Sequence, residues 1–134
     1  MSATDVELIR EMLETFNRGE YERSLEYLHE DVELQQWGAL VDTDTYTGRE
    51  GFVRGLTLWL DEFETGFQFE PEELIDAGDA VLGQIRLRGI GRSSGVELEQ
   101  RVFHVYEVRE GKLRSARVFT DESDARRAAG LGDR

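Results

Sequence analysis

The chain has 134 residues and no cysteine, so disulfide bonds and thiolate metal sites are excluded. The formal net charge of −13 repels phosphate backbones and anionic lipid surfaces, so neither a nucleic acid nor a membrane is expected as a partner. Since the N-terminus is polar and acidic and no apolar stretch approaches the roughly 20 residues that span a bilayer, we expect a soluble, cytoplasmic protein.

Three helices are predicted in the first half of the chain. Apolar residues fall at helical spacing over residues 4–16, and Gly19 is a suitable stop. A second, shorter helix is predicted over residues 20–28. A third is predicted over residues 49–63, and its apolar stripe is wide enough to be largely buried.

The remaining pattern predicts strands. A short strand is expected over residues 32–36, followed by a loop over 38–46. A strand is expected over 67–75, where Pro71 suits an edge strand or a break in pairing, and a long strand covers 80–90. The longest signal is a β-hairpin over 96–121 with a polar turn at 109–112, and a weak helical tail covers 123–131.

This order of elements predicts one α+β domain over residues 1–134, with a core over about 4–121 and a tail over 122–134. The helices are expected on one face of a mostly antiparallel sheet. Glycines within the long strands (Gly83, Gly89 and Gly91) indicate strong curvature. A strongly curved sheet wrapped around the third, long helix gives a cone with an apolar interior.

His104 is the candidate for chemistry inside this cone. It alternates with Val102, Tyr106 and Val108, which puts it on the face that points inward. An imidazole can donate, accept or exchange a proton at cellular pH. The alternative is a core histidine that hydrogen-bonds a buried carboxylate or a backbone carbonyl.

Other residues are candidates for the pocket lining. Gln100 shares the face of His104 and Gln36 ends a strand, although exposed strand-end glutamines are the commoner outcome. Trp37 follows a strand and fits a pocket rim, whereas core packing is favoured for Trp59. No cofactor or metal is expected, because the two histidines have no regularly spaced partners.

Arginines recur on neighbouring strands and have two interpretations. They could bind a carboxylate ligand, or they could form cross-strand ion pairs with Glu97, Glu99 and Glu107. Ion pairing is the favoured interpretation in so acidic a chain. The arginines concerned are Arg86, Arg88, Arg101 and Arg117.

Four stretches resemble a known family: FNRGEYERSLEYLHEDVE, YTGREGFVRGLTLWLDEFE, EELIDAGDAVLGQIRLRGIGRSSGVELEQRVFHVYEVREGKL and SDARRAAGL. Together they are similar to the SnoaL-like branch of the nuclear transport factor 2-like superfamily over residues 4–131. The resemblance implies a cone-shaped α+β roll of the cystatin-like kind, a pocket inside the cone and homodimers formed through the open sheet face. It implies no single activity, because the superfamily holds isomerases, cyclases, epoxide hydrolases, dehydratases and non-catalytic domains.

The groups that known relatives use are replaced in this chain. A ketosteroid isomerase would have a tyrosine at Met12, a basic aspartate at Gln36 and a protonated aspartate at His104. A limonene epoxide hydrolase would have its charged groups at Ile85, Leu87 and Val118. The resemblance therefore does not imply chemistry with a carboxylate base.

Two functional hypotheses follow. In the first, a cyclase, isomerase or dehydratase acts on a small apolar carbonyl or hydroxyl compound, with His104 as proton donor or acceptor. Gln36 or Gln100 would orient the substrate, and the pocket would be shaped by Trp37, Trp59, Tyr106 and Val118. In the second, the chain is a non-catalytic ligand-binding or dimeric interaction domain, and apolar Phe103 and Val105 on the opposite face of the hairpin support the dimer.

The interior of the cone separates these hypotheses. A cavity of roughly 300 Å³ or more beside His104, with its second ring nitrogen held by another side chain, favours the enzyme. A cone filled by Phe16, Leu56 and Trp59 counts against it.

Overall fold

The computed structural model describes residues 2–36, 45–61 and 68–132. Its helices are α1 (Ser2–Asn17), α2 (Tyr21–Ser24), the 3₁₀ turn η1 (Leu25–Tyr27), α3 (Gly48–Asp61) and α4 (Glu122–Ala128). Its strands are β1 (Leu28–Gln36), β2 (Thr45–Thr47), β3 (Gln68–Asp76), β4 (Val81–Ile90), β5 (Glu97–Arg109) and β6 (Lys112–Phe119).

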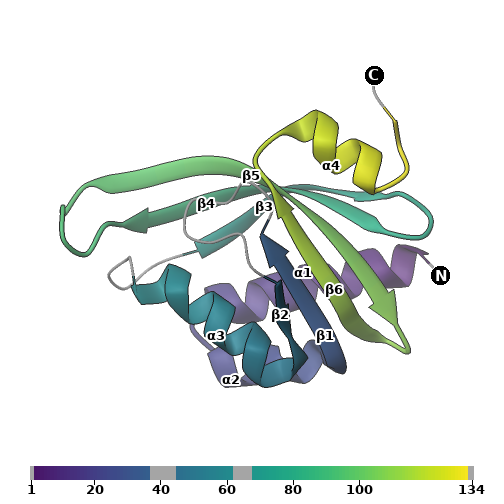
Figure 1. Cartoon of the computed structure of the whole chain (residues 1–134), viewed down its shortest axis with the longest axis horizontal. Helices are drawn as coiled ribbons and strands as arrows, with labels where there is room; N and C mark the ends of the chain where they lie inside the picture. The colour runs from purple at the N-terminus through teal and green to yellow at the C-terminus, as the bar shows by residue number, and fades with distance from the viewer. Residues whose placement is uncertain (1, 37–44, 62–67, 133–134) are drawn as a thin grey trace.

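The six strands form one curved sheet in the order β2-β1-β6-β5-β4-β3 (Figure 1). Only the β1–β6 pair is parallel; the other described neighbours are antiparallel. Register shifts interrupt the β3–β4, β5–β6 and β1–β6 ladders, and such irregularities bend strands and increase their twist. The predicted α+β class with a curved, mostly antiparallel sheet is confirmed.

Some helix and strand boundaries differ from the prediction, because pairing between distant strands sets them. The second helix is only the short α2 and the η1 turn, because β1 begins at Leu28, which pairs with Leu113 of β6. Pro71, by contrast, lies as predicted on an edge strand, β3, and beside a register shift in its pairing with β4. The polar segment before α3 contains a short strand, β2, that the sequence pattern did not indicate.

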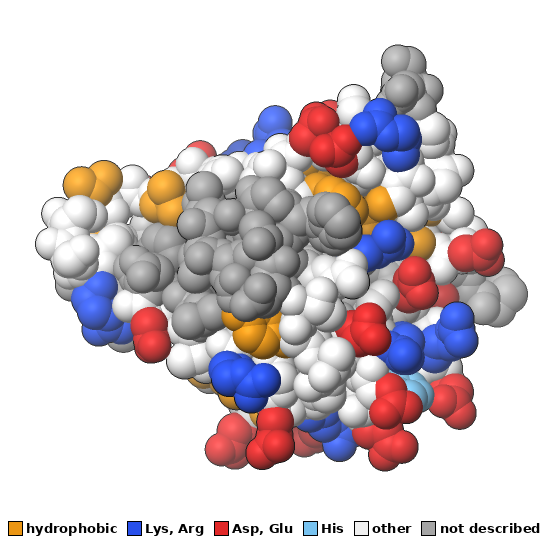
Figure 2. All heavy atoms as spheres, viewed as in Figure 1, with side chains coloured by type: hydrophobic (Ala, Val, Ile, Leu, Met, Phe, Trp, Pro, Cys, Tyr) orange, Lys and Arg blue, Asp and Glu red, His pale blue; other side chains and the backbone are white. Residues whose placement is uncertain are grey.

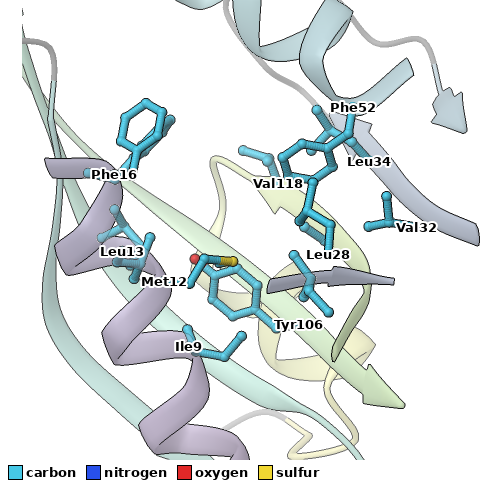
Figure 3. Packing of buried hydrophobic residues seen from close by; sticks show 14 of the residues in the cluster. Ile9, Met12, Leu13, Phe16, Leu28, Val32, Leu34, Phe52, Tyr106 and Val118 are labelled. Atoms are coloured by element: carbon cyan, nitrogen blue, oxygen red, sulfur yellow. The ribbon is translucent and has the colours of Figure 1, made fainter. Parts of the chain in front are cut away.

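The main core lies between the concave face of the sheet and helices α1 and α3. Figure 3 shows Leu13 and Phe16 of α1 on one side and Leu34 and Phe52 on the other, with Tyr106 rising between them from the sheet. Sheet residues such as Ile85, Val102 and Leu113 are almost completely buried beneath them. Burying such side chains contributes about 1.5–3 kcal/mol each, so this face carries most of the stabilisation.

The outer face of the sheet has a second, smaller core under α4. Phe103 and Val105 are 7% and 0% exposed there, packed with Phe119 and with Ala125 of α4. The prediction that all helices lie on one face is therefore wrong for α4. The apolar residues taken to support a dimer are covered within the chain itself, because the tail helix uses them. The homodimer stays a prediction.

The rest of the outer face over β3, β4 and β5 is an ion-pair network. Glu72 accepts hydrogen bonds from Arg101 Nε (2.8 Å), Arg86 Nη2 (2.8 Å) and Gln84 Nε2 (3.3 Å). Two further pairs join Arg88 to Glu70 and Glu99, and one joins Arg117 to Glu107. The arginines follow the ion-pairing interpretation, with β3 supplying two glutamates that the sequence did not suggest. Figure 2 shows acidic and basic side chains interspersed on one face of the molecule.

Glu72→Gln is expected to lower the free energy of unfolding by about 1 kcal/mol at pH 7, because the arginines are mostly solvated. The hydrogen bonds from Arg101 and then Arg86 lower the pKa of Glu72 to about 2. The stabilisation is therefore present above pH 4.5 and disappears as the pH falls through 2. Urea unfolding between pH 7 and pH 2 measures it. Glu73→Gln, a change at the exposed neighbouring residue, is the control and should have no effect.

Within the described part of the chain, none of the helices combines the length and the hydropathy that crossing a bilayer requires.

Candidate functional site

A cavity of about 70 Å³ lies between α1, α3 and the concave face of the sheet. Its described wall is almost entirely apolar, with side chains from both helices and from strands β1, β3, β4, β5 and β6. Of the lining residues that the structure describes, three carry a polar side chain: Ser24, His104 and Tyr106. Since α1 and α3 contact opposite ends of the sheet, the hollow is a product of the sheet's curvature.

His104 and Tyr106 form a buried pair on β5. They are two residues apart on one strand and therefore share its inward face. His104 Nδ1 lies 2.6 Å from Tyr106 Oη, and the two rings meet edge to face at 5.4 Å. His104 is 6% exposed and Tyr106 is 2% exposed. The partner of the imidazole is thus a hydroxyl, and neither the carboxylate nor the backbone carbonyl of the alternative interpretation.

The second ring nitrogen, His104 Nε2, has no hydrogen-bond partner in the part of the chain that the structure describes. Among the described residues it is the one buried side-chain nitrogen or oxygen in this condition. The other polar groups of the wall are occupied, since Ser24 Oγ donates to the carbonyl of Tyr21 at 2.6 Å and Tyr106 Oη is bonded to Nδ1. A buried polar atom left unpaired costs about 1–3 kcal/mol. Nε2 is therefore the group in the wall that a ligand atom can satisfy.

Burial keeps both members of the pair neutral. It lowers the pKa of His104 to about 4 and raises the pKa of Tyr106 above its ordinary value. If Tyr106 donates its hydroxyl proton to Nδ1, then Nε2 carries a hydrogen and is a donor. If Nδ1 donates to Tyr106, then Nε2 is an acceptor. The hydroxyl thus selects which role the open nitrogen plays.

Gly83 of β4 provides the space for this pair. It is the register partner of His104, and a Cβ at this position would lie 3.2 Å from Cε2 of Tyr106. Any side chain there would press on the Tyr106 ring, whose hydroxyl must reach Nδ1. From the sequence, Gly83 is expected only to curve the sheet; the strand register places it opposite His104.

The structure brings together His104, Tyr106 and Val118 of the predicted site residues in the cavity wall. Gln100 lies on the same face of β5, opposite Leu87, but is not among the described lining residues. The wall instead includes Phe69 and Phe52, which the sequence analysis did not single out. Phe69 alternates with Phe67 before Pro71, and that pattern was the available signal.

Three predicted site residues lie wholly or partly outside the described part of the chain. The backbone of Gln36 pairs with Val118 at the end of β1, but its side chain is not described. The backbone of Trp59 lies in α3, again without a described side chain, and Trp37 is not described at all. Their roles in the lining stay predictions.

The criteria for an enzyme are met in part. One ring nitrogen of His104 is held by another side chain, and Phe16 and Leu56 border the cavity instead of filling it. The cavity is nevertheless smaller than the roughly 300 Å³ at which small-molecule pockets usually begin. No aspartate or glutamate is found among the described residues of its wall, and the described residues contain no cluster of potential metal ligands.

The architecture is that of the nuclear transport factor 2-like proteins. One such protein from Burkholderia thailandensis E264 is 26% identical and superposes with a TM-score of 0.75, covering 94% of this chain and 95% of that one. The model of the SnoaL-like domain matches residues 9–116, so the chain belongs to the SnoaL-like family. The resemblance stated from the sequence is confirmed.

Two further proteins show the range of the similarity. The aklanonic acid methyl ester cyclase DnrD of Streptomyces peucetius is 27% identical over 126 residues, which cover 89% of this chain and 86% of that protein. Bal32a, from a soil-derived mobile gene cassette, has a TM-score of 0.77 at 20% identity, with 87% of this chain and 88% of that one covered. The second similarity concerns the fold alone.

Proposed function

We propose that the cavity binds a small, mainly apolar molecule through one carbonyl or hydroxyl oxygen, and that the protein catalyses a cyclase- or isomerase-type reaction with His104 at the reacting oxygen or carbon. The observation that carries the proposal is the unpaired Nε2 of His104 in the wall of an apolar cavity. An oxygen placed there removes an unsatisfied polar atom, while the apolar wall accepts the rest of the molecule. The similarity to a polyketide cyclase supports the reaction class.

The chemistry follows from the neutral imidazole. With its pKa near 4, His104 is uncharged at neutral pH and is a hydrogen-bond donor through Nε2 when Tyr106 donates to Nδ1. A donor aimed at a carbonyl oxygen stabilises the negative charge that develops there as the neighbouring carbon loses a proton to water or hydroxide, since the described wall holds no carboxylate base. In the other tautomer, Nε2 is itself the atom that takes a proton from carbon. The Tyr106 hydroxyl supports both steps because it donates or accepts.

A non-catalytic binding domain is the second candidate. It is favoured by the small cavity and by a described wall without a carboxylate to act as base. In this function the oxygen of the ligand still meets Nε2, but no proton leaves carbon.

Binding is tested with cyclopentanone and with methylenecyclopentane, a hydrocarbon of nearly the same shape. NMR of the His104 ring nitrogens during titration should show ketone binding about tenfold tighter than hydrocarbon binding, since one hydrogen bond contributes about 1.4 kcal/mol. The double variant His104→Leu/Tyr106→Phe should remove that preference, because the single change at His104 would free the Tyr106 hydroxyl in the same wall. Equal affinities for the two molecules in the unmodified protein would contradict the proposed role of Nε2.

Catalysis is tested in the same samples by exchange of the hydrogens beside the carbonyl with deuterium from D₂O. The unmodified protein should accelerate exchange over buffer, and His104→Leu/Tyr106→Phe should abolish the acceleration. Binding without accelerated exchange would support the non-catalytic domain.

Ala116→Leu is expected to fill the cavity. Ala116 is 4% exposed and lines the hollow, so three added carbon atoms occupy the space that a ligand would take. Affinity for cyclopentanone should fall at least tenfold, whereas the free energy of unfolding should change by less than about 2 kcal/mol. Titration and urea unfolding measure the two quantities. Ala128→Leu, in α4 on the other side of the sheet, is the control and should leave the affinity unchanged.

A further inference from the structure

Asn17 makes an unusual pair of bonds to the start of β3. Its Nδ2 donates to the carbonyl of Phe69 at 2.8 Å, and the amide of Phe69 donates to its Oδ1 at 2.9 Å. A third contact runs from Gln68 Nε2 to the carbonyl of Asn17 at 3.4 Å. Because β3 is the edge strand, these backbone groups face away from β4, and the Asn17 amide bonds them as a further strand would.

The residue that Asn17 holds is part of the cavity wall. The Phe69 ring lies edge-on to the His104 ring, with centroids 5.6 Å apart, and 5.3 Å from the ring of Phe16. Phe16 in turn contacts Tyr21, at 4.9 Å, and Tyr21 is 43% exposed. A continuous row of aromatic rings therefore runs from the surface at α2 to the imidazole, and Phe69 is its last member before His104.

We propose that Asn17 is a positioning residue: its side-chain amide fixes the backbone of Phe69 so that the Phe69 ring covers His104 and keeps water from the open ring nitrogen. The inference rests on the proposed function where it concerns a ligand. The contacts of Asn17, Phe69 and His104 do not depend on a ligand.

The chemical reason lies in the two-point contact. A single hydrogen bond would hold only one of the two peptide groups that flank the Phe69 Cα, whereas the donor and the acceptor of one planar amide hold both and hence fix the direction of the Phe69 Cα–Cβ bond. Asn17 also follows Phe16 directly, so the end of α1 sets two neighbouring aromatic rings of the wall. Because Nε2 has no partner among the described residues, its desolvation depends on the groups packed around it.

The proposal is tested without a ligand by following the titration of His104 with NMR in Asn17→Ala. We expect the imidazole to titrate at a pH about 1 higher than in the unmodified protein, since water then reaches Nε2. Phe69→Leu, which removes the ring directly, should produce the same change even if Asn17→Ala folds poorly. In the double variant Asn17→Ala/Phe69→Leu, the two shifts of the His104 titration should not add, because both act through the Phe69 ring.

Arg114→Ala is the matched control. It also removes a long-range bond from a side chain to the backbone, between Arg114 Nη1 and the carbonyl of Asp31, but away from the cavity. It should change stability without moving the His104 titration. The proposal is overturned if Asn17→Ala only lowers stability, if Phe69→Leu leaves the titration unchanged, or if the two changes add. Since no ligand or turnover is measured, failure here is distinct from failure of the proposed function.

Discussion

Lowering the pH from 7 to 4 is expected to cost the folded protein about 3 kcal/mol through His104 alone. Burial lowers the pKa of this imidazole to about 4 in the folded state, against 6.5 in an exposed histidine. Between these values the unfolded chain binds a proton that the folded protein does not. The contribution to stability is therefore complete above pH 6.5 and is lost as the pH falls to 4.

Urea unfolding at pH 7.5, 5.5 and 4 measures this effect. The comparison is the double variant His104→Leu/Tyr106→Phe, because His104→Leu alone leaves the Tyr106 hydroxyl buried without its partner. Replacing both members by apolar side chains should leave stability at pH 7.5 within about 1 kcal/mol. Glu72 titrates in both proteins and at lower pH, so the difference isolates His104. Parallel pH dependences for the two proteins would show that the imidazole titrates as if exposed.

Gly55→Val should lower the free energy of unfolding by about 2–3 kcal/mol. Gly55 is buried in α3 where the helix crosses the β1–β2 pair. A Cβ at this position would lie 2.8 Å from Cδ2 of Leu34 and 2.9 Å from Cδ2 of Tyr46. Valine adds two more carbons to a contact that is already too short, so the helix must move away from the sheet.

Thermal or urea unfolding tests this prediction against Thr57→Val. Thr57 is an exposed residue of the same helix, so its change also places a valine in α3 and removes only a hydrogen bond from its hydroxyl to the carbonyl of Val53. We expect the control to change the free energy of unfolding by less than about 0.5 kcal/mol. Because Leu34 lines the cavity, Gly55→Val should also weaken cyclopentanone binding. A stability loss no greater than that of Thr57→Val would mean that α3 and the sheet adjust without strain.

The site shows what the alternation of residues along a strand predicts and what it does not. Strict alternation on β5 was enough to place His104 on the inward face together with Tyr106, because side chains of a strand alternate regardless of what surrounds them. The same alternation could not show that the tyrosine hydroxyl holds one ring nitrogen and leaves the other unpaired. Nor could it show that Gly83 stands opposite, since that depends on the register between two strands.

Apart from β2, the order of helices and strands could be derived from the amino-acid sequence, as could the curved sheet and the inward-facing imidazole. Each follows from periodicity, glycine placement or resemblance over short stretches. Only the tertiary structure decided that α4 covers Phe103 and Val105, that Glu70 and Glu72 pair with arginines of the neighbouring strands, and that Asn17 binds the backbone of Phe69. These contacts join residues far apart in the chain, and several partners satisfy the same pattern equally well. The choice among them is made by packing, which brings one partner within bonding distance and buries the others elsewhere.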